Sequence, residues 1–292
     1  MWTNSRKSGK ASATDVDPEG RSVLVTGASS GIGYLIAQLL ADRGFHVFAG
    51  GRKRVDVEDL SRHRNITGIH LDVTSTDDIA AAVELVGAHS RPLFGLVNNA
   101  GIINCAPLSE VDEEEVIRMF DVNVFGAYRV TRAFAPMLIE SQGRIANIGS
   151  VSGFFSTSFN GLYGMTKHAL EAYSDSLSAE LKDLGVAVSS IVPSSFNSRL
   201  GKNMLARMRK GRHGAENSRF RDQLHRRIAF FEQDFSGKLE EPHKVAEAVY
   251  DVMTSTGPSG RYLVVSGKRD SWQYRLRVMA KALRMNARHS SG

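Results

Sequence analysis

Short apolar runs alternate with longer amphipathic segments along most of the chain. The runs have the length and the β-branched content of strands, whereas the apolar residues of the intervening segments recur at helical spacing. Seven strands are predicted in this way, at residues 21–27, 45–50, 66–73, 93–100, 144–150, 186–193 and 261–267. Helices are predicted between them, at residues 34–43, 56–63, 75–88, 110–140, 162–184 and 241–255.

The predicted strands are apolar along nearly their whole length. This pattern is typical of a parallel sheet with helices on both faces, so the fold class is α/β. The 292 residues suffice for one domain with a sizeable core, which we expect to extend from residue 21 to residue 270. Residues 22–41 carry no charge, but their serines and glycines indicate a strand, a turn and a helix instead of a membrane span.

Three segments fall outside the alternation of strands and helices. Residues 1–20 are polar and lack the apolar stretch of a signal peptide, so they predict a disordered leader. Residues 199–240 combine many cations with scattered Phe and Met side chains, and we expect an insertion that covers the substrate site as a lid. Residues 271–292 form a basic tail, in which residues 271–288 have the spacing of an amphipathic helix.

The formal net charge of +6 is distributed unevenly along the chain. Residues 1–198 hold 17 basic and 22 acidic side chains, whereas residues 199–292 hold 20 basic and 9 acidic ones. The excess positive charge therefore lies on the expected lid and tail, where it indicates an anionic partner or a solvated face. For residues 271–288 we favour packing against the body or a second subunit over weak contact with a membrane surface. No nucleic-acid partner is expected, because no recognition motif accompanies the charge.

Cys105 is the single cysteine of the chain. It excludes an intramolecular disulfide, and no Cys/His cluster has the spacing of a zinc site, so no metal is expected. A reducing compartment fits this composition best, and the protein is predicted to be cytoplasmic.

Two features indicate a nucleotide site. The turn at residues 26–33, TGASSGIG, directly follows the first predicted strand and opens the first predicted helix, where glycines let the backbone approach a pyrophosphate. The second predicted strand ends at Gly50-Gly51-Arg52-Lys53, where an NAD site would usually place an acidic residue. Two cations at that position suit a 2′-phosphate, so NADP is favoured over NAD.

Ser150, Tyr163 and Lys167 form the candidate catalytic set. Tyr163 and Lys167 are four residues apart in a helical segment and therefore lie one turn apart on the same face. An ammonium group beside a phenol favours the phenolate, so the lysine together with a positively charged oxidised nicotinamide is expected to lower the pKa of Tyr163. Ser150 follows a predicted strand, where its hydroxyl can hold a substrate oxygen beside the tyrosine.

These residues together resemble the short-chain dehydrogenase/reductase family over residues 21–267. The family patterns TGxxxGxG, NNAG and YxxxK are matched at residues 26–33, 98–101 and 163–167. Ser150 lies thirteen residues before the tyrosine, and the helix asparagine of the family is matched by Asn123. The resemblance implies a Rossmann-type, doubly wound, seven-stranded parallel sheet and NAD(P)-dependent oxidoreduction of an alcohol/carbonyl pair. It also suggests a homodimer or homotetramer built from the helices at 110–140 and 162–184.

The resemblance assigns roles to individual residues. Tyr163 would be the general acid in reduction, Lys167 would bind the nicotinamide ribose, Ser150 would orient the carbonyl and Asn123 would hold a water in a proton relay. The residues expected to bind the cofactor are Gly27, Ser29, Ser30, Gly31, Ile32, Gly33, Arg52, Lys53, Asp72, Val73, Asn99, Ala100, Gly101, Tyr163, Lys167, Pro193, Phe196 and Ser198. One position departs from the family, because Ser194 stands where a glycine usually follows the proline.

Within the family, the catalytic helix is most similar to the retinol and 17β-hydroxysteroid dehydrogenase branch. The expected function is therefore that of an NADP-dependent carbonyl reductase, reversible as an alcohol dehydrogenase, for an apolar steroid-, retinoid- or lipid-like substrate. One alternative is a ketoreductase for carrier- or CoA-linked acyl substrates, whose anionic carrier would meet the basic lid. Another is an NADP-sensing protein without turnover, which the complete catalytic set disfavours.

Overall fold

The structure is a computed structural model that describes residues 2–3, 16–197, 199–212, 214–235 and 240–266. The predicted tail at 271–292 and the predicted cofactor residue Ser198 lie outside the described residues.

The sheet contains all seven predicted strands, and every pairing between them is parallel. The strands are β2 Ser22–Val25, β3 His46–Gly51, β4 Ile66–His70, β5 Leu93–Asn98, β6 Arg144–Ile148, β7 Ala187–Pro193 and β8 Arg261–Val264. A short additional strand, β1 Trp2–Thr3, pairs with β8 at one edge, inside the segment expected to be a disordered leader. Two residues carry no periodicity, so the sequence gives no signal for such a strand.

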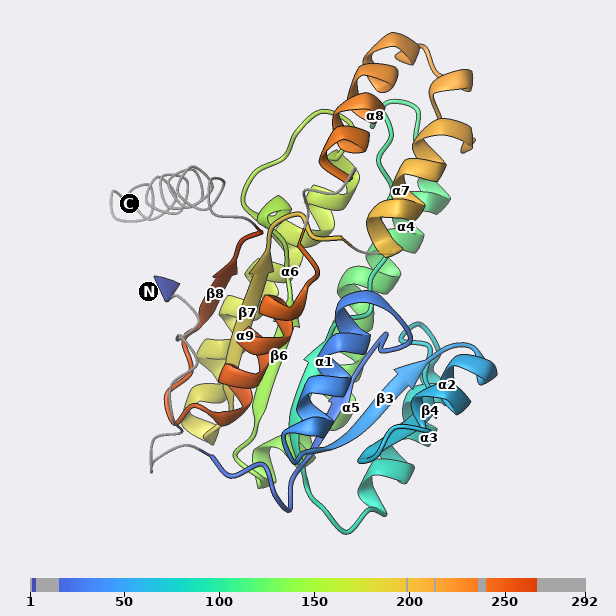
Figure 1. The fold of residues 1–292 in the computed structure, drawn as a ribbon. Helices are drawn as coiled ribbons and strands as arrows, with labels where there is room; N and C mark the ends of the chain where they lie inside the picture. Colours follow the sequence, from blue (N-terminus) through green and yellow to red (C-terminus); the bar gives the residue numbers. More distant parts are fainter. Residues whose placement is uncertain (1, 4–15, 198, 213, 236–239, 267–292) are drawn as a thin grey trace, which may run out of the picture.

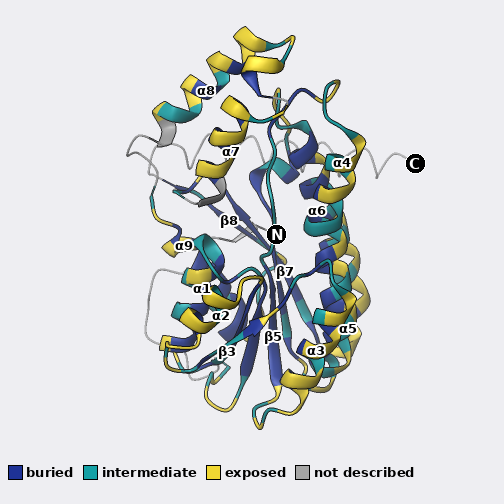
Figure 2. Cartoon of the chain, turned by 90° about the vertical axis from the view of Figure 1, so that its right-hand side faces the viewer, coloured by how far each residue is buried: buried dark blue, intermediate teal, exposed yellow. Residues whose placement is uncertain are grey.

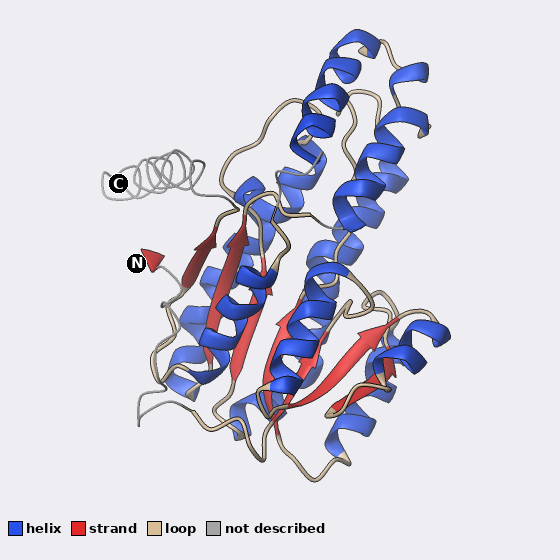
Figure 3. Cartoon of the chain, in the orientation of Figure 1, coloured by secondary structure: helices blue, strands red, loops and turns tan. Residues whose placement is uncertain are grey.

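The strand order is β1-β8-β7-β6-β5-β2-β3-β4 (Figure 3). The chain runs outward from β2 to β4 and then returns to β5 on the other side of β2, so the direction of winding reverses between these two central strands. Ligands of open parallel sheets bind at such a reversal, beyond the carboxyl ends of the strands. The turns at residues 26–33 and 98–101 leave β2 and β5 at that place.

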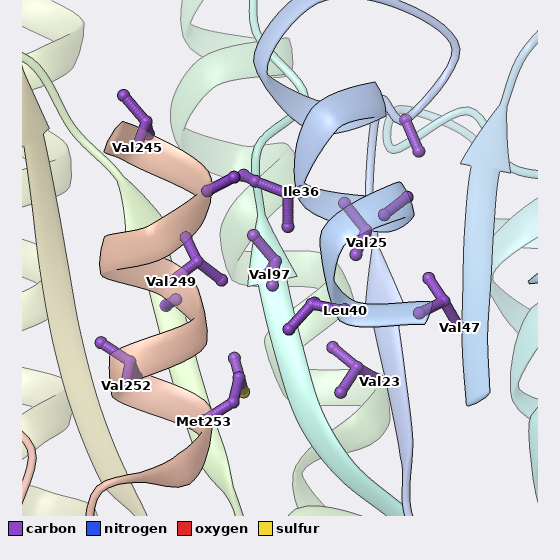
Figure 4. Close-up of a cluster of buried hydrophobic side chains, with 14 of the residues drawn as sticks. Val23, Val25, Ile36, Leu40, Val47, Val97, Val245, Val249, Val252 and Met253 are labelled. Carbon is purple, nitrogen blue, oxygen red and sulfur yellow. The ribbon is translucent and has the colours of Figure 1, made fainter. Parts of the chain in front are cut away.

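Helices cover both faces of the sheet, which confirms the Rossmann-type fold (Figure 2). One face carries α1 Gly31–Asp42, α2 Arg54–Leu60 and α9 His243–Thr254, and the other carries α3 Thr76–Gly87, α5 Gly126–Glu140 and α6 Gly161–Leu181. Figure 4 shows Val249 of α9 and Leu40 of α1 beside Val97 of β5 in a hydrophobic cluster, and these three side chains are fully buried. Each such side chain contributes roughly 1.5–3 kcal/mol by leaving water. The site at the strand ends therefore rests on a rigid base.

The predicted helix at 110–140 differs from the observed structure. It consists of α4 Glu113–Phe120, a π-helical turn at Asp121–Phe125, and α5. A π turn inserts an extra residue into the helical repeat and is frequent at functional sites. Asn123 lies in this turn.

Two helices extend past the carboxyl ends of the strands, α7 Arg199–Lys210 and α8 Arg221–Phe235 (Figure 1). They pack together over a separate buried cluster that includes Met204, Met208, Leu224 and Ile228. Cys105 of the body belongs to the same cluster, so the helix pair sits on the segment that follows β5. Among the described residues, no helix combines the length and the apolar character of a transmembrane span.

Candidate active site

The glycine-rich turn is locked to the end of β5. Gly27 and Gly31 have φ of +63° and +60°, values that favour glycine. A Cβ atom on Gly33 would lie 2.3 Å from Nδ2 of Asn99 and 2.5 Å from the carbonyl oxygen of Gly27. A side chain at position 33 is therefore excluded by the close approach of the two turns.

Hydrogen bonds join the same two turns. Asn99 donates from Nδ2 to the carbonyl oxygens of Thr26 at 2.8 Å and Gly27 at 3.0 Å. The buried Thr26 hydroxyl accepts from the backbone N–H groups of Asn99 and Ala100, both at 3.0 Å. The glycine-rich motif includes Thr26 without predicting a role for it, and the structure shows that its hydroxyl joins the two turns.

The amino end of α1 is open for an anion. Ser30 caps the helix without a side-chain hydrogen bond, and the first turn holds no acidic residue. No heavy atom lies within 4 Å of the position that a Cβ on Gly31 would take. Unpaired N–H groups and the helix dipole attract phosphate, so these residues fit the pyrophosphate of a dinucleotide.

The predicted cations lie at the end of β3, on the same edge of the sheet. Arg52 is 67% exposed, and its Nη1 is 3.9 Å from Oδ2 of Asp72, which leaves the guanidinium largely free to meet a ligand. Lys53 is also exposed. Partial burial would raise the pKa of Asp72, but hydrogen bonds from Thr74 and the charge of Arg52 lower it below its ordinary value. Asp72 is therefore a charged acceptor.

Three predicted cofactor residues have side chains that pack in the core. Ile32 and Phe196 belong to the cluster on the α1 face, and Val73 belongs to the cluster on the α5 face. Ile32 is only partly buried, and the contribution of all three residues to a cofactor site stays a prediction.

Tyr163 and Ser150 meet at the carboxyl end of β6. Tyr163 lies in the first turn of α6 and is 8% exposed, and the Ser150 side chain lies close enough to its hydroxyl to act on its pKa. The Ser150 hydroxyl also accepts from the N–H of Ser152 at 3.1 Å, which fixes its orientation. Burial raises the pKa of Tyr163 well above its ordinary value, and the nearby Ser150 side chain offsets only part of this effect.

Lys167 lies one turn further along α6. Its Nζ donates to the carbonyl oxygen of Ile148 at 2.7 Å and is 5.7 Å from the centre of the Tyr163 ring. Burial lowers the pKa of Lys167 to about 8, while the charge of Glu171 opposes the change. Burial thus dominates the pKa of Tyr163 in the cofactor-free site, and the fall expected from the lysine together with an oxidised nicotinamide stays a prediction.

Asn123 is buried, and its side-chain amide forms hydrogen bonds with both the N–H and the carbonyl oxygen of Ile102. Its Oδ1 accepts from the Ile102 N–H at 2.8 Å, and its Nδ2 donates to the Ile102 carbonyl at 2.9 Å and to Oγ1 of Thr166 at 3.1 Å. The residue therefore ties the segment after Gly101 to the catalytic helix. The expected water-holding role stays a prediction.

Ser194 replaces the usual glycine without strain. It is not among the described non-glycine residues with positive φ, which are Asn65, Gln142 and Phe159. Its N–H donates to the Val264 carbonyl at 2.8 Å, and its hydroxyl accepts from the Ser266 N–H at 3.0 Å. The serine thus fixes the loop after Pro193 to the end of β8.

Sequence reasoning missed Glu171, a buried carboxyl group on α6. It accepts hydrogen bonds from Ser190 of β7 and Arg261 of β8. The available signal was its spacing of four residues from Lys167, which places it on the same helix face.

Comparisons with known proteins agree with this geometry. The family model "short chain dehydrogenase" matches residues 21–209. The chain is 40% identical over 186 residues to the "Uncharacterized oxidoreductase YbbO" of Escherichia coli K12, covering 63% of this chain and 69% of that protein. It is 38% identical over 183 residues to 17-beta-hydroxysteroid dehydrogenase type 6 of Rattus norvegicus, covering 61% and 57%.

The fold is similarly shared with solved structures. A short-chain dehydrogenase from Streptomyces avermitilis superposes with a TM-score of 0.74 at 26% identity, covering 93% of this chain and 95% of that one. The matched segment contains the glycine-rich turn, Asn123, Ser150, Tyr163 and Lys167. The chain therefore belongs to the short-chain dehydrogenase/reductase family of oxidoreductases.

Proposed function

We propose that the protein is an NADP(H)-dependent oxidoreductase that interconverts a carbonyl group and an alcohol on an apolar substrate. The observation that carries the proposal is the buried Tyr163 hydroxyl near the Ser150 side chain, with Lys167 one helical turn away, at the edge of the sheet that also carries the open amino end of α1. A carbonyl oxygen held between the two hydroxyls would stand at the carboxyl ends of the central strands.

The residues of the chain have distinct tasks in this mechanism. Ser150 binds and orients the carbonyl oxygen, and Tyr163 donates its proton to that oxygen as the carbon accepts a hydride. Burial keeps the Tyr163 phenol protonated, which suits proton donation and hence the direction of reduction. When bound, the reduced nicotinamide supplies the hydride.

NADP is the cofactor that the exposed charges favour. Arg52 and Lys53 follow β3 and lie on the side of the sheet where Ser29 approaches Gly51. A guanidinium group binds a phosphate in a bidentate manner. The Ser29 and Ser30 hydroxyls, which make no described hydrogen bond, are free to add contacts at the same edge.

The proposed substrate space lies beneath α7 and α8. Arg227 of α8 donates to Oγ1 of Thr157 at 2.9 Å, and Cys105 under the lid influences the pKa of Tyr163, so this helix pair borders the catalytic tyrosine. The Met- and Phe-rich inner face of the pair favours an apolar substrate. The similarity to 17-beta-hydroxysteroid dehydrogenase type 6 supports the same class.

A panel of carbonyl compounds tests this function. Purified protein with NADPH is expected to consume the cofactor with apolar ketones or aldehydes and to form the matching alcohol, measured by absorbance and mass spectrometry. Consumption with carrier-linked acyl ketones alone would favour a ketoreductase instead. Tight NADPH binding with no product from any carbonyl or alcohol would contradict catalysis.

A further inference from the structure

Glu171 continues the row of catalytic residues on α6. Tyr163, Lys167 and Glu171 follow one another at intervals of four residues and therefore share one helix face. Glu171 is 5% exposed, and ionised carboxylates are rarely buried without a specific partner.

The partners of Glu171 come from two strands. Its Oε1 accepts from the Ser190 hydroxyl at 2.6 Å, and its Oε2 accepts from Nε of Arg261 at 3.1 Å. Arg261 also binds the exposed Asp175, so the guanidinium is shared between two carboxylates. The carboxylate of Glu171 is thus held in one position between α6, β7 and β8.

The loop that carries Ser150 closes directly on Glu171. A Cβ on Gly149 would lie 2.3 Å from Oε1 of Glu171, and a Cβ on Gly153 would lie 2.9 Å from its Cγ. Glycine on both sides of the catalytic serine therefore makes room for this carboxylate. Its position is built into the active-site loop, which a carboxylate serving only as a surface ion pair would not require.

The charged groups around Glu171 are few among the described residues. The charges of Lys167 and Asp175 on α6 and of Arg261 on β8 act on or with Glu171, whereas β7 contributes the neutral Ser190 and the turn at 149–153 contributes no charge. Burial raises the pKa of Glu171, and the hydrogen bond from Ser190 and the charge of Arg261 oppose this change in favour of the carboxylate. Burial lowers the pKa of Lys167 to about 8, and the negative charge of Glu171 acts against this change. Without the carboxylate, desolvation of the ammonium group would act unopposed.

We propose that Glu171 is a positioning residue that keeps the Lys167 ammonium charged inside the buried catalytic site, and that Ser190 and Arg261 hold the carboxylate in place for this task. The inference rests on the proposed function, because the charge of Lys167 matters for a Tyr163 that transfers a proton. A purely structural Glu171 would instead join α6 to β8 without effect on the lysine.

The titration of Lys167 in the cofactor-free protein tests the proposal. NMR of protein labelled at the lysine Cε follows the midpoint of Lys167, whose signal is assigned by its loss in Lys167→Met. Glu171→Gln keeps the size and the acceptor for Ser190 but removes the charge, and the Lys167 midpoint is expected to fall by about one pH unit or more. Glu171→Asp retains the charge, so its midpoint is expected to lie closer to that of the wild type.

Asp175→Asn is the matched control, because it perturbs the same Arg261 from the exposed side and leaves Glu171 in place. Its Lys167 midpoint is expected to equal that of the wild type. If Glu171→Gln lowers the melting temperature but leaves the midpoint unchanged, the role of Glu171 is structural and the proposal is overturned. If Glu171→Gln does not fold, Glu171→Asp is the deciding variant, because its shorter side chain moves the carboxylate away from its present position. Its Lys167 midpoint is expected to fall by a smaller amount than in Glu171→Gln, and a midpoint equal to that of the wild type would overturn the proposal.

Measuring enzymatic turnover alongside the NMR titration distinguishes a failure of this proposal from a failure of the proposed function. In an active enzyme, Glu171→Gln is expected to shift the alkaline limb of the kcat/KM profile to lower pH by the same amount as the NMR midpoint. A shifted midpoint in a protein that reduces no carbonyl would support the electrostatic role of Glu171 and contradict the enzymatic function. An unshifted Lys167 midpoint in an enzyme that reduces carbonyl compounds would support the enzymatic function and contradict the electrostatic role of Glu171.

Discussion

Burial acts on Tyr163 and Lys167 in the same sense, since it favours the neutral form of each group. The phenol therefore holds its proton and the lysine holds its own only weakly, with a pKa of about 8. A protonated tyrosine beside Ser150 is prepared to donate to a carbonyl oxygen. The charge of Glu171 and that of a bound cofactor therefore decide how far the pKa values of Tyr163 and Lys167 depart from those in the cofactor-free site.

Arg52 gives the most direct prediction for a single side chain. Arg52→Asp is expected to weaken NADPH binding by about 10- to 100-fold, the loss of one charge-assisted phosphate contact, and to leave NADH binding nearly unchanged. Its ion pair with Asp72 is long and exposed, so the free energy of unfolding should change little. Binding titrations with both cofactors provide the measurement.

The control for Arg52 is Arg54→Asp, because Arg54 is exposed and pairs with Glu58 within α2. It is expected to bind both cofactors as the wild type does. Equal losses of NADPH and NADH affinity in Arg52→Asp would show that the residue does not meet a 2′-phosphate.

The catalytic side chains could be predicted from the sequence because their spacing is a property of the helix. Tyr163 and Lys167 share a face of α6, and Ser150 ends β6 next to them. The pKa of Tyr163 could not be predicted, because it depends on the depth of burial and not on the neighbouring lysine alone. Glu171 was missed because the partners of a buried carboxylate come from distant strands.

The turn after β2 is joined to the turn after β5 by hydrogen bonds to the hydroxyl of Thr26. Thr26→Val removes the hydroxyl that accepts from the N–H groups of Asn99 and Ala100. The half-buried N–H of Ala100 loses its acceptor, whereas the N–H of Asn99 keeps the Val97 carbonyl at 3.1 Å. The free energy of unfolding is therefore expected to fall by roughly 1–3 kcal/mol, with weaker NADPH binding. Urea unfolding and cofactor titration measure the two effects.

Thr26→Ser keeps the hydroxyl and is the matched control. It is expected to bind NADPH like the wild type and to lose at most about 1 kcal/mol for the missing methyl group. If Thr26→Val and Thr26→Ser behave alike, the hydroxyl does not join the turns.

The positions of helices and strands followed from the hydrophobic pattern, but their irregularities did not. The pattern at 110–140 predicts one helix, whereas the structure contains a π turn at Asp121–Phe125. This turn presents Asn123 to Ile102, a contact between segments that the local pattern does not encode. Ser194 similarly gains its partner, Ser266, only from the fold.

The assembly of the whole molecule is suggested by one exposed apolar face. Ile117, Phe125 and Tyr128 of the α4–α5 segment are 60%, 48% and 47% exposed. Large apolar side chains gathered on one segment mark association sites, so we expect a homodimer through this face. Sedimentation velocity should show a dimer for the wild type and a shift toward monomer for Phe125→Arg.

Phe230→Arg is the control for assembly, because Phe230 is similarly exposed at 51% but lies on α8. It is expected to sediment like the wild type. A monomeric wild type, or equal effects of the two substitutions, would contradict the assignment of the face.

The excess positive charge of the chain lies in a different part of the sequence from the candidate catalytic and nucleotide-binding residues. The nucleotide turns and the catalytic residues lie in the mildly acidic first two thirds, while the described part of the excess positive charge lies on α7 and α8. Lys202 and Lys210 are exposed on α7, whereas Arg207, Arg209 and Arg212 make ion pairs within the protein. These three arginines therefore help to attach the helix pair to itself and to the body. The cytoplasmic location stays a prediction.

The reduction of a carbonyl substrate by wild-type protein and by Tyr163→Phe is the decisive comparison. The substitution removes only the hydroxyl that would donate the proton, and Ser150 and Lys167 remain. We expect kcat to fall by about 10²- to 10⁴-fold, the usual contribution of a general acid, while the Kd for NADPH stays unchanged. Turnover within a few-fold of the wild type, with NADPH still bound, would contradict the assignment of Tyr163 as the acid.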